Sequence, residues 1–182
     1  MRCSLLSPKS NLAAVFAWLL LAAFSHAQAA PESDVSFQYS HLFVTSGPKV
    51  NIYGASCSGS YNFDEWLGFV GDIGLYHRPQ TGSNLTGITY MFGTRISYRK
   101  LERVVPFIQG LAGGSHFSSR LGGASGSINP FSYAFGAGVD ITLGRSGKVA
   151  LRPQVEYIGF RYMTDGARAS IGIAYRIGRR TE

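Results

Sequence analysis

The sequence has little charge and almost no cysteine. Charged residues make up 15% of the 182 residues, whereas ordinary soluble domains contain roughly 25%. The two cysteines are Cys3 and Cys57, and Cys3 lies in an N-terminal segment that we interpret below as a cleaved leader. Cys57 would then remain alone, which excludes an intramolecular disulfide and a cysteine metal cluster.

The sequence also lacks the features of disordered, collagen-like and nucleic-acid-binding chains. Its 23 Gly and 7 Pro follow no repeat period and occur together with 13% aromatic residues, so neither disorder nor a collagen helix is expected. The net charge is +7, but the basic residues are scattered along the chain. Because nucleic-acid binding requires clustered positive charge, we expect no nucleic-acid partner.

Residues 1–29 have the three parts of a secretory signal peptide. The basic start, the apolar run and the A-x-A cleavage signal are formed by Arg2 and Lys9, by Leu12 to Phe24, and by Ala27-Gln28-Ala29. The apolar run is shorter than the roughly 20 residues that a membrane-spanning helix requires. We therefore expect residues 1–29 to be removed and residues 30–182 to form one mature domain.

The mature chain shows no convincing helical period. Instead, eight segments alternate between bulky apolar residues and small or polar residues, and turn residues separate them. A strand tilted by about 45° needs roughly 9–11 residues to cross a bilayer, and each segment is long enough. The segments are residues 34–44, 51–63, 67–77, 86–98, 104–116, 131–143, 149–162 and 167–178.

The two faces of these segments differ in a way that no soluble domain explains. In residues 131–143, one face carries Phe131, Tyr133 and Phe135, and the other carries Ser132 and Gly136. A core of glycine and serine cannot fill a soluble domain at native density, so the apolar face is expected to meet lipid. Since backbone groups in hydrocarbon must all be paired, the sheet must close. We predict an all-β fold, an eight-stranded antiparallel up-and-down transmembrane β-barrel.

The connections between the predicted strands alternate in length. Residues 64–66, 99–103 and 144–148 are short, whereas 117–130 is predicted to be a long loop and 78–85 an intermediate one. With the N-terminus in the periplasm, the short connections are periplasmic turns and the longer ones face outward. Two aromatic girdles are predicted, with Tyr61, Phe63, Trp66, Tyr98 and Tyr175 at one end and Tyr53, Phe131, Tyr133 and Tyr162 at the other.

Several short motifs in the mature chain occur in the order seen in a known family. They are Tyr61–Gly68, Phe92–Arg95, Pro106–Gly110, Gly136–Asp140 and Arg168–Gly172. On these motifs the sequence resembles the outer-membrane β-barrel domain of the outer-membrane protein A/X type. The resemblance implies insertion by the barrel-assembly machinery from the periplasm. Such barrels often finish with an aromatic residue in the last strand, whereas this chain ends in Arg179-Arg180-Thr181-Glu182.

The inward parity of the strands collects charged side chains of both signs. An unpaired ion inside a narrow barrel costs several kcal/mol, so pairing between arginine and carboxylate is expected. The charges form either a structural network that fills the interior or a charged gate in a small pore. We favour the network, because eight strands enclose space only for side chains. Its predicted members are Asp72, Arg95, Asp140, Arg152, Glu156 and Arg168, with Arg176 on the same face.

The predicted function is non-enzymatic, either structural or in surface interaction, at the outer membrane of a Gram-negative-type cell. The main alternative is a hydrolase, since outer-membrane lipid A deacylases contain a His-x-Ser pair and this chain has His116 and Ser118. A serine nucleophile needs a base and an acidic group that orients it, and no acidic residue lies between Ser118 and Asp140. A narrow ion-conducting pore is the other alternative.

The expected partners follow from this location. They are outer-membrane lipid, lipopolysaccharide and, during insertion, the barrel-assembly machinery, and the barrel is expected to be a monomer. Basic residues in or near the loops are candidates for contact with lipopolysaccharide phosphates. These are Lys49, Arg78, Arg120 and Arg161. The histidines are too few and dispersed for a metal site, and no cofactor is predicted.

Overall fold

The chain is described by a computed structural model over residues 33–44, 51–80, 83–101, 103–121, 124–161 and 165–177. The expected signal peptide, residues 1–29, lies outside the described residues. Within these ranges, no helix is long and apolar enough to cross a membrane. The strands are β1 (Ser33–Val44), β2 (Asn51–Asn62), β3 (Leu67–Gln80), β4 (Ser83–Ser97), β5 (Val104–Leu121), β6 (Ala124–Ile128), β7 (Phe131–Leu143), β8 (Val149–Phe160) and β9 (Gly166–Ile177).

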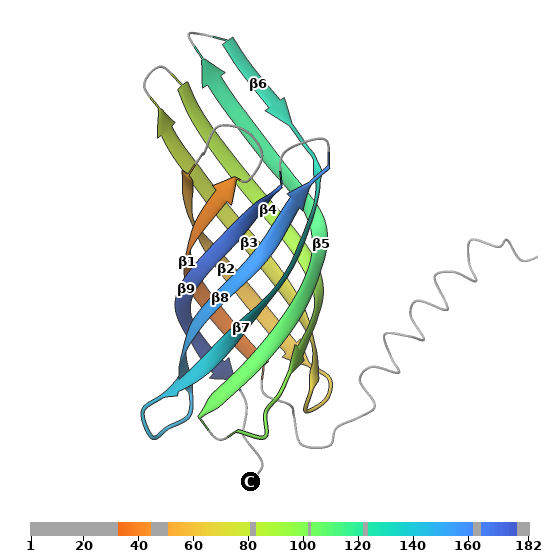
Figure 1. Ribbon diagram of the computed structural model, residues 1–182, viewed down its shortest axis with the longest axis vertical. Coiled ribbons are helices and arrows are strands. Elements are labelled where there is room, and N and C mark those ends of the chain that lie inside the picture. The colour runs from red at the N-terminus through yellow and green to blue at the C-terminus, as the bar shows by residue number, and fades with distance from the viewer. Residues whose placement is uncertain are drawn as a thin grey trace, which may run out of the picture. The chain divides into compact units, whose positions relative to one another are not determined.

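Eight of these strands close into an antiparallel barrel (Figure 1). Their order around the barrel is β1-β2-β3-β4-β5-β7-β8-β9, and β1 closes it by pairing with β9 from Ser33↔Ile177 to Val44↔Gly166. Closure pairs the backbone groups of strands that would otherwise be sheet edges, as hydrocarbon requires. The predicted eight-stranded antiparallel barrel is confirmed.

The connections at the two ends differ in character. At one end, here called the turn end, residues 63–66 join β2 to β3 and residues 144–148 join β7 to β8. At the opposite end, here called the hairpin end, the strands run on past the positions where the alternation in the sequence stops. β3 continues to Gln80, and β4 begins at Ser83 instead of residue 86.

The prediction of a long loop over residues 117–130 is wrong. β5 continues to Leu121 and turns back as β6, which pairs with β5 from Phe117↔Ile128 to Leu121↔Ala124. Residues 77–80, 83–87, 117–121 and 124–128 therefore form four adjacent strands, here called the protruding sheet, and β5 and β6 extend furthest in Figure 1. The alternation disappears here because a strand beyond the lipid-facing belt needs no apolar face.

The bulky apolar side chains cover the outside of the barrel. Phe37, Phe135 and Val155 are 68%, 64% and 61% exposed, whereas Ser36 and Ala134, the neighbours of Phe37 and Phe135 in sequence, are buried. This confirms which face of each strand points inward, and a continuous apolar exterior is typical of a surface that meets lipid. Exposed aromatic residues are Tyr61, Phe63, Trp66, Tyr98 and Tyr175 towards the turn end, and Tyr53, Phe131 and Tyr133 towards the hairpin end; Tyr162 lies outside the described residues.

The small residues of the inner face provide space for large ones on the next strand. A Cβ at Gly138 would lie 2.5 Å from Cζ of Phe107, and one at Gly74 would lie 2.6 Å from Oγ1 of Thr89. A narrow barrel therefore alternates long side chains with glycine around each row. Because inner glycines face larger side chains on the neighbouring strand, the inner residues fill a narrow barrel although they are too small to form the core of a soluble domain.

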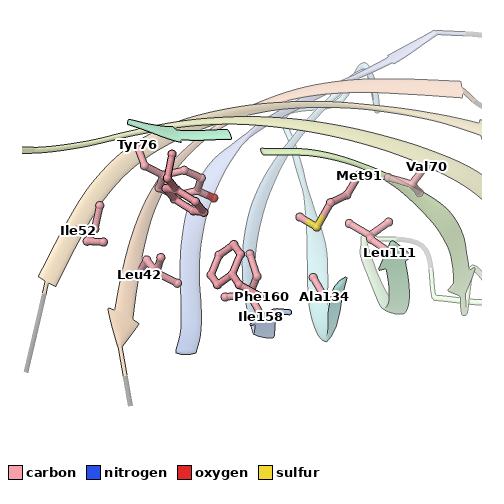
Figure 2. Packing of buried hydrophobic residues seen from close by; sticks show 10 residues of the cluster. Leu42, Ile52, Val70, Tyr76, Met91, Leu111, Ala134, Ile158 and Phe160 are labelled. Carbon is pink, nitrogen blue, oxygen red and sulfur yellow. The ribbon is translucent and has the colours of Figure 1, made fainter. Parts of the chain in front are cut away.

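Apolar side chains pack together inside the barrel as well (Figure 2). Leu42, Ile52 and Tyr76 come from β1, β2 and β3, and Phe160 comes from β8. The ring of Phe160 meets that of Phe117 edge-on, with centroids 5.2 Å apart. These residues fill the interior towards the hairpin end, beyond the charged side chains described next.

Candidate functional site: an ion network inside the barrel

The six charged residues that the sequence predicts as members of the interior network are all buried. The most exposed of them, Asp140, is only 7% exposed, and Arg152 and Arg168 are 0% exposed. They come from five strands and lie in two groups that we call the turn-side cluster and the hairpin-side cluster. The turn-side cluster contains Arg95, Asp140 and Arg152, and the hairpin-side cluster contains Asp72, Glu156 and Arg168.

The turn-side cluster is held by a bidentate ion pair. Arg152 donates from Nε to Oδ1 of Asp140 at 2.6 Å and from Nη2 to Oδ2 at 2.8 Å. Asp34 is a further member, since its Oδ1 lies 2.8 Å from Nη1 of Arg152 and its Oδ2 lies 3.7 Å from Nη1 of Arg95. Ser60 donates a hydrogen bond of 2.5 Å to the same Asp34 carboxylate. Two guanidinium groups thus face two carboxylates, so the formal charges balance.

An aromatic ring completes this cluster. The guanidinium carbon of Arg95 lies 4.3 Å from the centre of the Phe107 ring, and that of Arg152 lies 5.4 Å from it. Such cation–π contacts are worth more when the cation is desolvated, as both are here. The Phe107 ring therefore contacts the guanidinium groups of both Arg95 and Arg152.

The hairpin-side cluster is centred on Arg168. Its Nη2 lies 2.5 Å from Oε2 of Glu156, and its Nη1 donates to Oδ1 of Asp72 and to the Tyr76 hydroxyl, both at 2.9 Å. One guanidinium group meets two carboxylates here. Oδ2 of Asp72 is buried without a hydrogen-bond partner among the described residues, which is consistent with one negative charge in excess.

Gln109 joins the two clusters. Its Oε1 accepts hydrogen bonds from Nε and Nη2 of Arg95 at 2.9 and 2.7 Å, and its Nε2 donates to Oε1 of Glu156 at 2.7 Å. The register explains the reach, because Gly136 lies between Gln109 and Glu156 on the intervening strand and has no side chain. A continuous chain of contacts therefore runs from Asp34 to Asp72.

Three members of this arrangement were missing from the sequence prediction. Asp34 shares the inward face of β1 with Ser36 and Ser40, so the same parity rule would have included it. Gln109 and Tyr76 are uncharged, and a search for ion pairs passes over them. Arg176, placed inward by parity, lies apart from both clusters and donates to Oγ1 of Thr142 and to the Gly147 carbonyl at 3.0 and 3.3 Å.

The arrangement is suited to filling space and cross-linking strands. Buried ion pairs lose hydration, and they keep a net benefit only where further hydrogen bonds satisfy the remaining donors and acceptors. Here most of the polar atoms have partners, and the two central guanidinium groups have no exposed area. Within the described residues, no group of three or more His, Cys, Asp and Glu side chains could hold a metal ion.

The His-x-Ser pair lies on the outward face of β5. Nδ1 of His116 is 2.6 Å from Oδ1 of Asn129, so an amide occupies the position that an orienting acidic group takes in a serine hydrolase. The Ser118 side chain makes no hydrogen bond with any described residue, and its backbone pairs across the strands with Thr86 and Ser127. Asn129 therefore orients the His116 ring, but no hydrogen bond connects His116 with Ser118 among the described residues.

The loop cations are only partly described. Arg78 is half-buried and Arg161 is exposed, and the Arg161 amide donates to the Phe131 carbonyl at 2.8 Å. Lys49 and the side chain of Arg120 lie outside the described residues. Arg78, Arg120 and Arg161 all belong to the hairpin end.

Comparison with known proteins identifies the fold. Neither a family model nor a curated protein matches the sequence. The crystal structure of Ail, the attachment invasion locus protein of Yersinia pestis, matches with a TM-score of 0.62 at 19% identity, covering 82% of this chain and 100% of that one. Neisserial surface protein A matches with 0.61 at 12%, covering 81% and 96%. The N-terminal β-barrel domain of Pseudomonas aeruginosa OprF matches with 0.59 at 13%, covering 82% and 100%.

Proposed function

We propose that this chain, which has the fold of the eight-stranded outer-membrane barrels, is a non-enzymatic outer-membrane protein that presents the protruding sheet at the cell surface for interaction with other macromolecules. The barrel anchors the sheet, and the buried ion network makes the barrel a rigid, filled support. In this proposal the turn end faces the periplasm and the hairpin end faces outward, in keeping with the short-turn rule for such barrels.

The observation that carries the proposal is the unequal protection of the two edges of the protruding sheet. Residues 78–80 of β3 form one edge, where Pro79 has no N–H to donate. β6 forms the other edge, and among the described residues it pairs with β5 alone. Its sequence, Ala-Ser-Gly-Ser-Ile, has neither proline nor charge. An edge without these protecting features can accept an extended strand from another protein.

The comparisons support a surface role by analogy of fold. The name of Ail is attachment invasion locus protein, and that protein has been crystallised with the heparin analogue sucrose octasulfate. We extend the analogy to this chain only as a surface role. Contact with lipopolysaccharide phosphates through Lys49, Arg78, Arg120 and Arg161 belongs to the same proposal, as do cleavage after Ala29, insertion by the barrel-assembly machinery, and a monomeric barrel.

The location can be tested with a single cysteine. Cys57 is exposed on the outer face of the barrel, so it is first replaced by serine, and Ser125→Cys is then added on β6. A membrane-impermeant maleimide should label this variant in intact cells, and the matched variant Ser146→Cys at the turn end should be labelled only after lysis. The reverse pattern would contradict the proposed orientation. Fractionation should place the protein in the outer membrane, and unboiled protein should migrate differently from boiled protein on a gel.

The interaction role is tested by removing the hairpin. A variant in which residues 118–127 are replaced by a two-residue turn keeps the whole barrel and loses β6. Cells that display the parent protein should aggregate or adhere to surfaces more than cells that display the variant. Equal adhesion at equal surface amounts would contradict the role that we assign to the sheet.

A second candidate function remains because of the contact between His116 and Asn129. It is an outer-membrane hydrolase in which Ser118 attacks an acyl ester of a lipid such as lipid A. The gap between this candidate and the structure is the absence of a hydrogen bond from Ser118 to His116 within the described residues.

A further inference from the structure

A hollow on the protruding sheet is lined by hydroxyl groups. It has a volume of about 550 Å³. The residues that line it include a single imidazole, and none of the described side chains among them is charged at neutral pH. They are His77, Thr86, Ser118, Ser119, Ser125 and Ser127, with Gly126 between the last two.

Four of these side chains form one row across four strands. His77 of β3 lies opposite Thr86 of β4, Thr86 lies opposite Ser118 of β5, and Ser118 lies opposite Ser127 of β6. None of the four makes a side-chain hydrogen bond with another described residue, so their donors and acceptors remain available for a ligand. A set of neutral donors and acceptors at regular spacing matches the hydroxyl groups of a sugar ring better than it matches a phosphate, which favours cations.

The row continues into aromatic rings. Tyr53 of β2 lies opposite His77 and is about half exposed. His41 of β1 is stacked on Tyr53 with centroids 4.6 Å apart and planes 7° apart, so the Tyr53 ring is held in place. Rigid aromatic rings beside hydrogen-bonding groups offer both an apolar body and polar contacts, which suits the apolar face of a sugar as well as its hydroxyl groups.

The place of the hollow points to a lipid-borne sugar. One step along the same outward face, Leu75 of β3 lies opposite Ile88 of β4, and both are exposed. These belong to the apolar exterior that faces lipid in the proposed function. A molecule with its headgroup in the hollow would therefore lay its acyl chains along Leu75 and Ile88.

We propose that this hollow binds the neutral saccharide headgroup of a glycolipid in the surrounding leaflet. The inference rests on the proposed function only for the membrane setting. Glycolipid binding and the proposed function can be contradicted independently, because retention of a glycolipid by purified protein does not depend on the labelling pattern in cells or on adhesion.

The test uses the purified barrel in lauryldimethylamine oxide, a detergent without a sugar. Native mass spectrometry measures how much monoglucosyl diacylglycerol stays bound, in comparison with phosphatidylcholine and phosphatidylglycerol of the same acyl chains. We expect preferential retention of the glycolipid by the parent protein. Equal retention of all three lipids, or preference for phosphatidylglycerol, would overturn the proposal.

The variant Thr86→Val/Ser118→Ala/Ser127→Ala removes three hydroxyl groups without changing the inner face. Because each neutral hydrogen bond contributes on the order of 1 kcal/mol, glycolipid affinity should fall about tenfold or more. The control, Thr94→Val/Ser146→Ala, loses hydroxyl groups nearer the turn end and should bind as the parent does. Both variants should keep the gel migration of a folded barrel.

Two outcomes are decisive against the inference. If the triple variant retains the glycolipid as well as the parent protein, the hydroxyl row does not bind it. If free maltose is retained as strongly as the glycolipid and with the same sensitivity to the substitutions, the ligand is a soluble sugar and the assignment to a membrane lipid is wrong.

Discussion

Arg152 of β8 and Asp140 of β7 form their ion pair at a break in the backbone ladder between their strands. Pairing stops after Gly138↔Gln154 and resumes at Ile141↔Leu151, with Pro153, which has no N–H, in the gap. The residue count on the two sides is equal, so the register is kept without a bulge. The two charge-assisted hydrogen bonds, at 2.6 and 2.8 Å, hold the strands together where the backbone does not.

The two clusters predict different costs for the loss of one carboxylate. Asp140→Asn leaves two guanidinium groups with only Asp34, and we expect a loss of about 1–3 kcal/mol in the free energy of unfolding. Asp72→Asn leaves Arg168 with Glu156 at balanced charge and should cost clearly less. Urea unfolding in lipid vesicles, followed by the fluorescence of Trp66, measures both. A greater loss for Asp72→Asn would contradict the assignment of the excess charge.

A methyl group at Gly136 should disturb the link between the clusters. A Cβ there would lie 2.3 Å from the Val155 carbonyl oxygen and 2.5 Å from Cγ of Glu156. Gly136→Ala should therefore lower the free energy of unfolding by about 1–3 kcal/mol, as overpacking does. Gly110→Ala is the matched control, since its nearest contact, Phe135 Cδ2, is 3.9 Å away. The same urea titration should show little change for the control.

The barrel should not conduct ions. Arg152 and Arg168 are fully buried, and the chain of contacts from Asp34 to Asp72 crosses the interior. Reconstitution into planar bilayers should give a flat current trace at voltages where porins open. Stepwise conductance that changes in Arg95→Ala would show that the network is a gate instead of a filling.

The hydrolase candidate predicts an activity that the surface role does not. We expect the purified protein to release no fatty acid from outer-membrane lipid, measured by mass spectrometry of the lipid after incubation. Ser118→Ala and Asn129→Ala should leave this result unchanged. Release by the parent protein that both substitutions abolish would establish the hydrolase and remove the non-enzymatic assignment.

Much of the fold follows from the alternation of side chains, because the lipid and the narrow interior impose opposite demands on successive residues. Phe135 and Gly136 illustrate this contrast within one strand. Where neither demand applies, the alternation is lost, and so the sequence predicts a long loop over residues 117–130 although β5 and β6 pair with each other there. Parity alone also explains why the ion network was predicted only in part. Parity predicts that Arg95 and Glu156 point inward, but the sequence does not show that uncharged Gln109 reaches from one to the other across Gly136.

The pairing of β1 with β9 joins residues that are far apart in the chain, as in the hydrogen bond between Ser40 and Ser170. A piece of the sequence contains both strands of this seam in full only if it spans residues 33 to 177. A chain that stops before Gly166 would leave β1 and β8 with unpaired backbone groups, which invite aggregation. The barrel can therefore close only after β9 has been synthesised. The last strand in the sequence supplies the partner that the first strand, β1, needs on its second edge.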